Sequence, residues 1–261
     1  MTSIAAWAGV DSRGLSSLYI ASDSRISWTG RKRSSWDQGR KVFACYSKPH
    51  IFGYWGDILF PVLALPVLVD RIDRGFLASA DQDGHASIYQ AIRRLWEGYP
   101  AGLDFSIVHG LRIGDTMSSR FSLAVMTYRG GTWSTQSLDM PGKSALLLSE
   151  GSGKWAVRRA YREWQESHSA NTSRAVFSAF CESITSQSDS YTGGAPQLAG
   201  LYRIGSGRLF GIVHAGQRYF AGSVLTGAER LDGVEWRNNL FEIADGETKR
   251  RLSGAQAHKP R

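Results

Sequence analysis

Thr2 is the residue whose position suggests chemistry most directly. It follows Met1 and precedes a short apolar run, residues 4–8. Removal of Met1 is expected before so small a residue, and the processed chain would then begin with a threonine that carries a free α-amine. Such a residue holds both nucleophile and base, because its hydroxyl attacks a carbonyl while its amine, with a pKa near ~8, accepts the proton. Many proteins have threonine at position 2 without this activity, so the hypothesis depends on the rest of the chain.

The charge balance is basic. The 261 residues include 31 Lys and Arg against 23 Asp and Glu, a formal net charge of +8. The basic residues gather in segments 31–33 and 249–261, both in polar, loop-like surroundings. No compact basic motif with interleaved aromatic residues is evident, so we interpret these segments as solvated surface and do not expect nucleic-acid binding.

Cysteine, histidine and apolar patterns narrow the class of protein further. Cys45 and Cys181 lie far apart in apolar neighbourhoods, so we expect buried free thiols in a reducing compartment. The start of the chain lacks the features of a secretory signal. Residues 58–69 form the most apolar stretch, which is too short to span a bilayer. We therefore expect a cytoplasmic protein that enters no membrane. The scattered histidines predict neither a metal site nor a cofactor.

Apolar periodicity divides the chain into strands and amphipathic helices. Helical spacing predicts a helix over residues 85–97, and Asp57 and Asn171 are the expected N-caps of two other helices. Gly130 and Gly131 predict a hairpin turn. A fourth helix is expected after residue 153. The expected strands are residues 3–10, 15–22, 41–45, 49–54, 105–108, 120–129, 132–138, 144–148, 198–204, 209–214 and 217–224.

This order of elements predicts the fold class. Strands, two helices, strands, two helices and strands follow one another, without an internal repeat or a linker. Sheets that bury one face on each other and the other face under helices form layers. We therefore predict an α+β protein, a four-layer α/β/β/α sandwich of two antiparallel sheets flanked by helices. Residues 1–245 are expected to form one domain, and residues 246–261 a basic polar tail.

Six short motifs carry a more specific signal. In chain order they are Thr2-Ser3-Ile4, IASDSR at 20–25, GRKV at 39–42, GYWGD at 53–57, GSG at 151–153 and DSYTGG at 189–194. Each motif alone is common, but their order and spacing resemble the β-type subunits of proteasomes, of the bacterial group that includes simpler ATP-dependent ring proteases. The resemblance implies an N-terminal nucleophile (Ntn) hydrolase fold and a threonine peptidase.

The resemblance also implies roles for two charged residues. Lys41 would place an ammonium beside the Thr2 hydroxyl, where it stabilises a developing alkoxide and helps to keep the α-amine neutral. A buried ammonium needs a partner, and Asp23 is the expected counter-ion. A purely structural Asp–Lys pair is the alternative.

Four further residues complete the implied catalytic set. Gly53, expected in a loop after a strand, would donate its backbone N–H to the oxyanion, and a glycine there allows close approach of the substrate. Ser152 would contact the Thr2 amine or a bound water. Asp189 and Thr192 would orient Ser152 and the amine. Most family members have serine where this chain has Thr192, so the hydroxyl is kept and a methyl group is added.

The resemblance assigns five positions to the pocket for the side chain before the scissile bond: Ile26, Gly39, Phe43, Ile51 and Trp55. Their apolar character predicts a preference for uncharged apolar residues. Trp55 replaces a residue that is usually small, and is expected to narrow the pocket.

The implied partners are a peptide or unfolded protein substrate, further copies of the chain in a homo-oligomeric ring, and an ATP-dependent unfoldase. Activation is expected to need only the removal of Met1. Two alternatives remain: a non-catalytic ring subunit, and an Ntn amidase that acts on a small-molecule amide. The intact set of Thr2, Asp23 and Lys41 argues against the first. The second class usually begins with Cys or Ser and lacks the Asp–Lys pair.

Overall fold

The computed structural model describes residues 2–28, 34–77, 84–100, 102–186, 188–227, 229 and 232–256. The expectations for Met1, for the basic segment 31–33 and for tail residues 257–261 lie outside the described residues.

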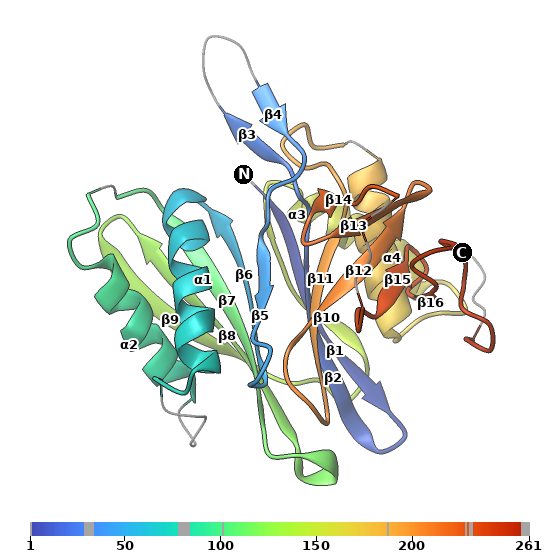
Figure 1. The fold of residues 1–261 in the computed structure, drawn as a ribbon, viewed down its shortest axis with the longest axis horizontal. Coiled ribbons are helices and arrows are strands. Elements are labelled where there is room, and N and C mark those ends of the chain that lie inside the picture. Colours follow the sequence, from blue (N-terminus) through green and yellow to red (C-terminus); the bar gives the residue numbers. More distant parts are fainter. Residues whose placement is uncertain are drawn as a thin grey trace.

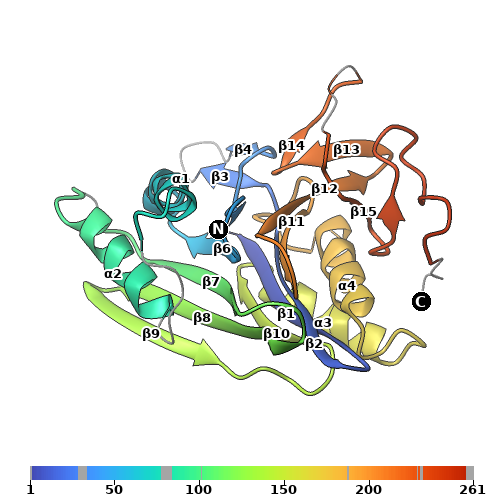
Figure 2. The same cartoon turned by 60° about the horizontal axis from the view of Figure 1, so that its bottom comes forward.

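Two sheets and four helices form the four predicted layers (Figures 1 and 2). The first sheet has the order β10-β1-β2-β11-β12-β13-β14, and β15 and β16 join it beside β12. Its strands are β1 (Ser3–Asp11), β2 (Gly14–Ser22), β10 (Ala145–Gly151), β11 (Gln197–Tyr202), β12 (Arg208–His214), β13 (Gln217–Phe220), β14 (Ser223–Val224), β15 (Trp236–Asn238) and β16 (Ile243–Ala244). The fold class predicted from the sequence is thus confirmed, except that β15 pairs with β12 in parallel.

The second sheet has the order β5-β6-β7-β8-β9. Its strands are β5 (Val42–Ala44), β6 (His50–Gly56), β7 (Phe105–Ile113), β8 (Arg120–Arg129) and β9 (Thr132–Leu138), and a short hairpin of β3 (Ile26–Trp28) and β4 (Ser34–Trp36) stands apart. Gly130 and Gly131 form the predicted hairpin turn between β8 and β9, both with positive φ (53° and 82°), as the tight turns of hairpins require.

Helices cover the outer face of each sheet. Helices α1 (Leu59–Asp73) and α2 (Gly84–Trp96) lie on the second sheet, and α3 (Lys154–Gln165) and α4 (Ser173–Thr185) lie on the first, while a 3₁₀ turn, η1 (Thr116–Ser118), joins β7 to β8. No helix in the described ranges is long and apolar enough to cross a bilayer. Cys45 and Cys181 are buried free thiols, as predicted.

Both N-caps predicted from the sequence are wrong. Helix α1 begins one residue later than Asp57 would allow, with Ile58 at the N-cap and no side-chain hydrogen bond. Helix α4 is capped by Thr172, whose Oγ1 accepts a hydrogen bond from Ala175 N, while Asn171 has a left-handed φ of 58°. Asn171 and Thr172 are both suitable caps by type, and the path of the chain into α4 selects Thr172, whereas α1 begins without a side-chain cap.

Strand β1 is apolar on both faces because it is covered on both. Ile4, Ala6 and Ala8 face the core between the sheets, whereas Ala5 and Trp7 face the core under α3 and α4. This alternation follows from the two-residue period of a strand. A third core separates α1 and α2 from the second sheet. The start of β1 is therefore held rigidly between layers.

The C-terminal tail begins within a hydrogen-bonded turn. Asp245 N donates to the carbonyl of Arg250 at 2.8 Å, and Arg251 forms an isolated bridge with Ala244. The boundary expected at residue 245 therefore falls inside a structured segment.

Candidate active site

Strand register brings the start of the chain next to Asp23. Thr2 and Ser3 stand at the beginning of β1, and Asp23 directly follows β2. Because Ile4 pairs with Ser22, the next residues outward, Ser3 and Asp23, also face each other. Ser3 N donates to Asp23 Oδ1 at 2.9 Å, and Asp23 N donates to Ser3 O at 3.1 Å. The amide immediately after Thr2 is thus bonded to a carboxylate.

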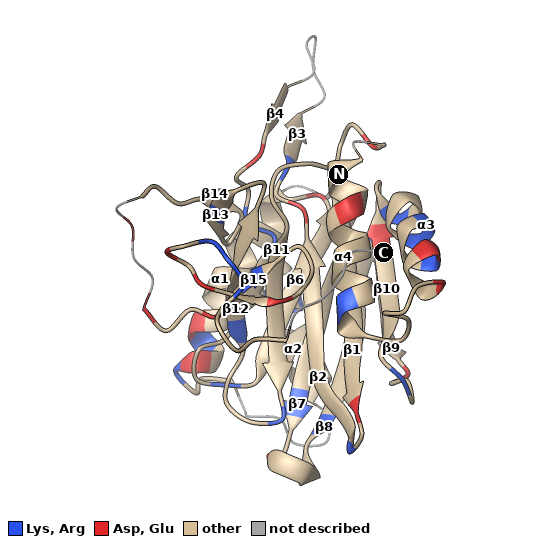
Figure 3. Ribbon diagram, turned by 90° about the vertical axis from the view of Figure 1, so that its right-hand side faces the viewer, with Lys and Arg blue, Asp and Glu red and all other residues tan. Residues whose placement is uncertain are grey.

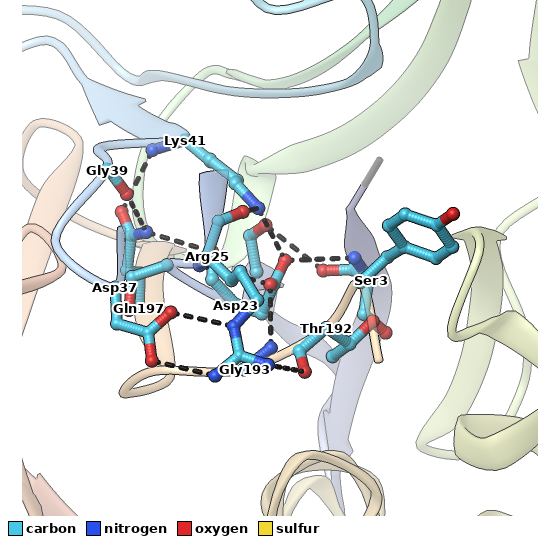
Figure 4. Close-up of polar contacts among 12 residues, drawn as sticks. Ser3, Asp23, Arg25, Asp37, Gly39, Lys41, Thr192, Gly193 and Gln197 are labelled. Carbon is cyan, nitrogen blue, oxygen red and sulfur yellow. Dashed lines mark hydrogen bonds and ion pairs between the residues drawn. The ribbon is translucent and has the colours of Figure 1, made fainter. Parts of the chain in front are cut away.

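Lys41 forms an ion pair with Asp23 from the segment that leads into the second sheet. It lies directly before β5, and its Nζ is 2.7 Å from Asp23 Oδ1, with both side chains fully buried. The same Nζ donates to the carbonyl of Arg25 at 2.5 Å. Burial lowers the pKa of Lys41, and the Asp23 carboxylate opposes that shift. The ammonium therefore shares one carboxylate oxygen with the amide that follows Thr2 (Figure 4).

Asp23 accepts four hydrogen bonds, which compensate for its burial. Ser3 N and Lys41 Nζ bond Oδ1, while Gly193 N and Arg25 N bond Oδ2 at 3.1 and 3.2 Å. A buried carboxylate without such partners would be strongly destabilising. The pair is thus held in one geometry by the backbones of three segments.

Two glycines without side chains allow the turn between β10 and α3 to lie close to the first residues of the chain. A Cβ at Gly151, whose φ is +86°, would lie 1.8 Å from the Thr2 carbonyl oxygen. A Cβ at Gly153 would lie 2.7 Å from both Ser3 Oγ and Thr192 Oγ1. At Gly151 the backbone carbonyl and the left-handed φ leave room for glycine alone, and at Gly153 a side chain would force Ser3 or Thr192 to move. The turn that contains Ser152 therefore lies directly against Thr2 and Ser3.

Asp189 is held by the loop that it belongs to. Thr192 Oγ1 donates to its Oδ2 at 2.8 Å, and Tyr191 N donates to its Oδ1 at 3.0 Å. Burial raises the pKa of Asp189, but hydrogen bonds from Ser152, Tyr191 and Thr192 outweigh that effect and leave it below the ordinary value. The carboxylate is therefore ionised at neutral pH. The structure thus brings Ser152, Asp189 and Thr192 together, and the threonine hydroxyl makes its bond despite the additional methyl group.

Gly53 lies within β6, in agreement with the strand expected over residues 49–54 and not in the loop expected for its role. It pairs with Val42 on one side and Val108 on the other. A Cβ at this position would lie 2.7 Å from Ile4 Cδ1 and 2.8 Å from Ile20 Cγ2. The strand continues through Gly53 because both of its neighbours pair with it. Gly53 thus lies against the beginning of β1, and its role as an oxyanion donor stays a prediction.

Of the five residues expected in the substrate pocket, three lie on the second sheet, whereas Ile26 belongs to the β3–β4 hairpin and Gly39 precedes β5. Ile51 is buried in the core between the sheets, and Trp55 packs against that core. Phe43 belongs to the core under α1 and α2. Ile26 contacts Gly39, where a Cβ would lie 2.4 Å from Ile26 Cδ1. The structure therefore brings Ile51 and Trp55 to one face and Ile26 to Gly39, but it places Phe43 on the opposite face from Ile51.

Gln197 is a site residue that sequence reasoning missed. Its Oε1 accepts from Lys41 N at 3.0 Å, and its Nε2 donates to the carbonyls of Asp23 at 3.0 Å and Gly39 at 2.7 Å. Its side chain is 1% exposed. One amide therefore joins β11 to the segments that carry both members of the ion pair. The signal in the sequence was a lone polar residue at the start of an apolar strand.

Arg25 was missed as well. Its guanidinium forms a two-fold ion pair with Asp37, at 2.7 and 2.8 Å, and donates to the carbonyls of Ser190 and Thr192. Gly193 leaves room for it, since a Cβ there would lie 2.4 Å from Arg25 Cζ. Arg25 thus ties the loop that carries Asp189 to the loop before Lys41, a contact that spans too much sequence for any local pattern to indicate.

Among the described residues, no three potential metal ligands lie close enough to hold an ion. The polar groups of the site are instead a hydroxyl at the chain start, a carboxylate–ammonium pair and a second carboxylate in a hydrogen-bonded loop. This set suits acid–base and nucleophilic chemistry.

Neither a protein-family model nor a curated protein sequence matches the chain. Solved structures do match. They include the Gly-1 mutant of Anbu from Hyphomicrobium sp. strain MC1, with a TM-score of 0.51, 10% identity and coverage of 85% of this chain and 88% of that chain. Anbu, the ancestral β-subunit, from Yersinia bercovieri matches with a TM-score of 0.49 and 13% identity, and the match covers 76% of this chain and 81% of that chain. Eukaryotic HslV from Trypanosoma brucei matches with a TM-score of 0.47 and 11% identity, and the match covers 76% of this chain and 99% of that chain.

These matches concern the fold. At 10% identity, the Hyphomicrobium structure shows that the two chains share their architecture. The Ntn, proteasome-subunit-like fold expected from the resemblance is thereby confirmed.

Proposed function

We propose that this chain is an N-terminal threonine peptidase, which cleaves peptide bonds through an ester on Thr2 after Met1 has been removed. The observation that carries the proposal is the buried Asp23–Lys41 pair, bonded through Asp23 Oδ1 to the amide that follows Thr2. A buried ion pair contributes little to stability when hydrophobic residues could replace it. Its place at the first residues of the chain favours a catalytic role.

The reaction begins with attack of the Thr2 hydroxyl on the scissile carbonyl. The free α-amine accepts the hydroxyl proton, and the Lys41 ammonium stabilises the developing alkoxide. Asp23 holds that ammonium in place. Gly53 N–H is the proposed donor to the oxyanion, and loss of one such donor typically lowers the rate by about 10²–10³.

The second half of the reaction releases the ester. The protonated amine gives its proton to the leaving nitrogen, and the same amine then activates a water that hydrolyses the ester on Thr2. Ser152, Asp189 and Thr192 are proposed to orient the amine, because their turn and loop lie directly against Ser3. Asp189, ionised at neutral pH, also favours the protonated form of the amine after attack.

The proposal includes the setting of the enzyme. The substrate is a peptide or an unfolded protein, and the pocket before the scissile bond takes an apolar side chain beside Ile26, Gly39, Ile51 and Trp55, with Phe43 behind the sheet. Copies of the chain form a ring in the cytoplasm, fed by an ATP-dependent unfoldase. The resemblance of the six sequence motifs to proteasome β-type subunits is what supports this assembly.

Intact mass spectrometry tests the proposal. The purified protein is incubated with and without a peptide-epoxyketone, which reacts with a terminal amine and hydroxyl together. We expect an adduct on the chain that lacks Met1. The adduct should be absent in Thr2→Ala and retained in Thr132→Ala, a control on the exposed strand β9. If the probe never adds although Met1 is demonstrably gone, the protein is instead a non-catalytic subunit.

A further inference from the structure

A pocket of about 480 Å³ opens beside the candidate active site, between the start of α3 and the loop of Asp189. Ser152, Gly153 and Asp189 line it on one side, and Trp155, Arg159 and Arg162 of α3 line it on the other. The pocket and the site therefore share three residues.

The position of this pocket relative to Thr2 identifies which part of a substrate could enter it. Gly153 lies against Ser3, within reach of its Oγ. The groups proposed to hold the side chain before the scissile bond come instead from β3, β6 and the segment before β5. A substrate whose acyl half lies along those elements would direct its leaving half toward the β10–α3 turn and this pocket.

The pocket has an excess of positive charge. Arg159 and Arg162 are exposed and lie three residues apart on α3, a helix that carries several Lys and Arg residues (Figure 3). Within the described part of the chain, neither forms an ion pair, whereas Lys154 and Arg158 of the same helix both pair with Glu150. The two guanidinium groups are therefore available to an incoming anion.

The acidic groups nearby leave the pocket with more positive than negative charge. Asp189 lines the pocket and is ionised, and its carboxylate accepts hydrogen bonds from Ser152, Tyr191 and Thr192, so one negative group stands against the two arginines. Glu163 on α3 and Glu166, the C-cap of that helix, follow Arg159 and Arg162 by four residues and do not line the pocket.

We propose that this pocket selects substrates with an acidic residue on the leaving-group side of the scissile bond. Guanidinium groups bind carboxylates through paired, charge-assisted hydrogen bonds. Trp155, 67% exposed, offers a flat wall for the aliphatic part of the same side chain. The proposal rests on the peptidase function, because a leaving group exists only if Thr2 cleaves an amide.

Three matched peptides test the selection. They are identical up to the scissile bond and carry Glu, Gln or Lys at the two positions after it. We expect kcat/KM for the Glu peptide to exceed that for the Gln peptide about tenfold, the usual effect of one charge-assisted contact, and the Lys peptide to be the poorest. The preference should weaken with added salt.

Substitutions of the two arginines test whether the preference for the Glu peptide comes from this pocket. The double variant Arg159→Gln/Arg162→Gln should bring the ratio of kcat/KM for the Glu peptide to that for the Gln peptide close to one. Arg94→Gln, an exposed arginine on α2, removes the same kind of charge in another layer and should keep the ratio. A wild-type ratio near one, or a ratio that survives in the double variant, overturns the proposal.

A binding measurement separates this proposal from the peptidase function. Fluorescence anisotropy on Thr2→Ala compares labelled peptides that carry Glu or Gln in the leaving half. About tenfold tighter binding of the Glu peptide, lost with both arginines, supports the pocket even if no peptide is ever cleaved, and in that case only the peptidase function fails. Equal binding of both peptides overturns the pocket.

Discussion

At the scale of single residues, the site depends on how one carboxylate is satisfied. Asp23 is bonded by Lys41 and by three backbone amides, one of which directly follows Thr2. Removing one partner of such a buried pair leaves an uncompensated charge, which costs more than the pair contributes. Substitutions here therefore change stability and activity together.

Lys41→Met should lower the free energy of unfolding by about 3–5 kcal/mol, because Asp23 is left buried without its counter-ion. It should also reduce probe labelling of Thr2 by at least about 10²-fold. Urea unfolding and the rate of adduct formation measure the two effects.

The double variant Asp23→Asn/Lys41→Met is the control for Lys41→Met. It removes both charges and should recover a large part of the lost stability, yet labelling should stay as low as in the single variant. Recovery of labelling along with stability would show that the pair is only structural.

Gln197→Met tests the residue that positions the pair. The change removes three hydrogen bonds and leaves buried groups at Lys41, Asp23 and Gly39 unsatisfied, each at a cost of about 1–3 kcal/mol. We expect lower stability and a kcat that falls more than KM rises, since the substrate does not touch this side chain. Gln136→Met, on the exposed face of β9, is the matched control. A change in KM alone would contradict a positioning role.

At the scale of elements, the site exists because three kinds of segment meet at the start of β1. Strand β2 delivers Asp23 through its register with β1, β5 delivers Lys41 from the second sheet, and the β10–α3 turn presses against Thr2 and Ser3. The turn can approach so closely only because it has no Cβ at its contact points.

Gly153→Ala should disturb the candidate active site while the fold stays intact. The added methyl would lie 2.7 Å from Ser3 Oγ and Thr192 Oγ1, so it displaces the turn from the start of the chain. We expect probe labelling to fall about tenfold or more, while circular dichroism shows an intact fold. A Cβ at Gly142 meets nothing within 4 Å, so Gly142→Ala should label normally. Equal labelling of both variants would exclude a role for this contact.

At the scale of the whole molecule, a chain of imidazoles joins a helix layer to the second sheet. His50 Nδ1 lies 2.9 Å from His109 Nε2, His109 Nδ1 lies 2.9 Å from His85 Nδ1, and His85 Nε2 lies 2.7 Å from Ser122 Oγ. Burial lowers the pKa of His50 to about 4 and, with the neighbouring imidazoles, holds the pKa of His109 well below its usual value. Neutral rings suit this chain, since each link needs one donor and one acceptor.

These pKa values predict how stability depends on pH. The unfolded histidines titrate near about 6.5, so between that pH and about 4 the unfolded state binds more protons. The free energy of unfolding should therefore be constant above about pH 7 and fall as the pH drops below about 6.5, by up to about 1.4 kcal/mol per pH unit for each histidine. Urea midpoints between about pH 7.5 and about pH 5 measure this slope.

Two variants test whether the change of the free energy of unfolding with pH comes from the chain of imidazoles. The double variant His50→Phe/His109→Phe should flatten it, whereas His214→Gln, outside the chain of imidazoles, should keep it. Constant stability of the wild-type protein down to about pH 5 would contradict the prediction whether or not the variants fold.

Local signals in the sequence determined many of the secondary-structure elements of this protein. The two-residue alternation in β1, the helical spacing in α2 and the adjacent glycines between β8 and β9 act over a few residues, so they predict elements without knowledge of the fold. The nucleophile could be proposed for the same reason, because a Thr2 released from Met1 would combine hydroxyl and amine in one residue.

Only the tertiary structure decided which distant groups meet. Gln197 and Arg25 join segments more than a hundred residues apart, and strand pairing placed Gly53 inside β6 and Phe43 behind the sheet from Ile51. Register depends on partners elsewhere in the chain, and a shift of one residue exchanges the two faces of a strand. A sequence shows which residues could do chemistry, but pairing between distant strands determines which of them face one another.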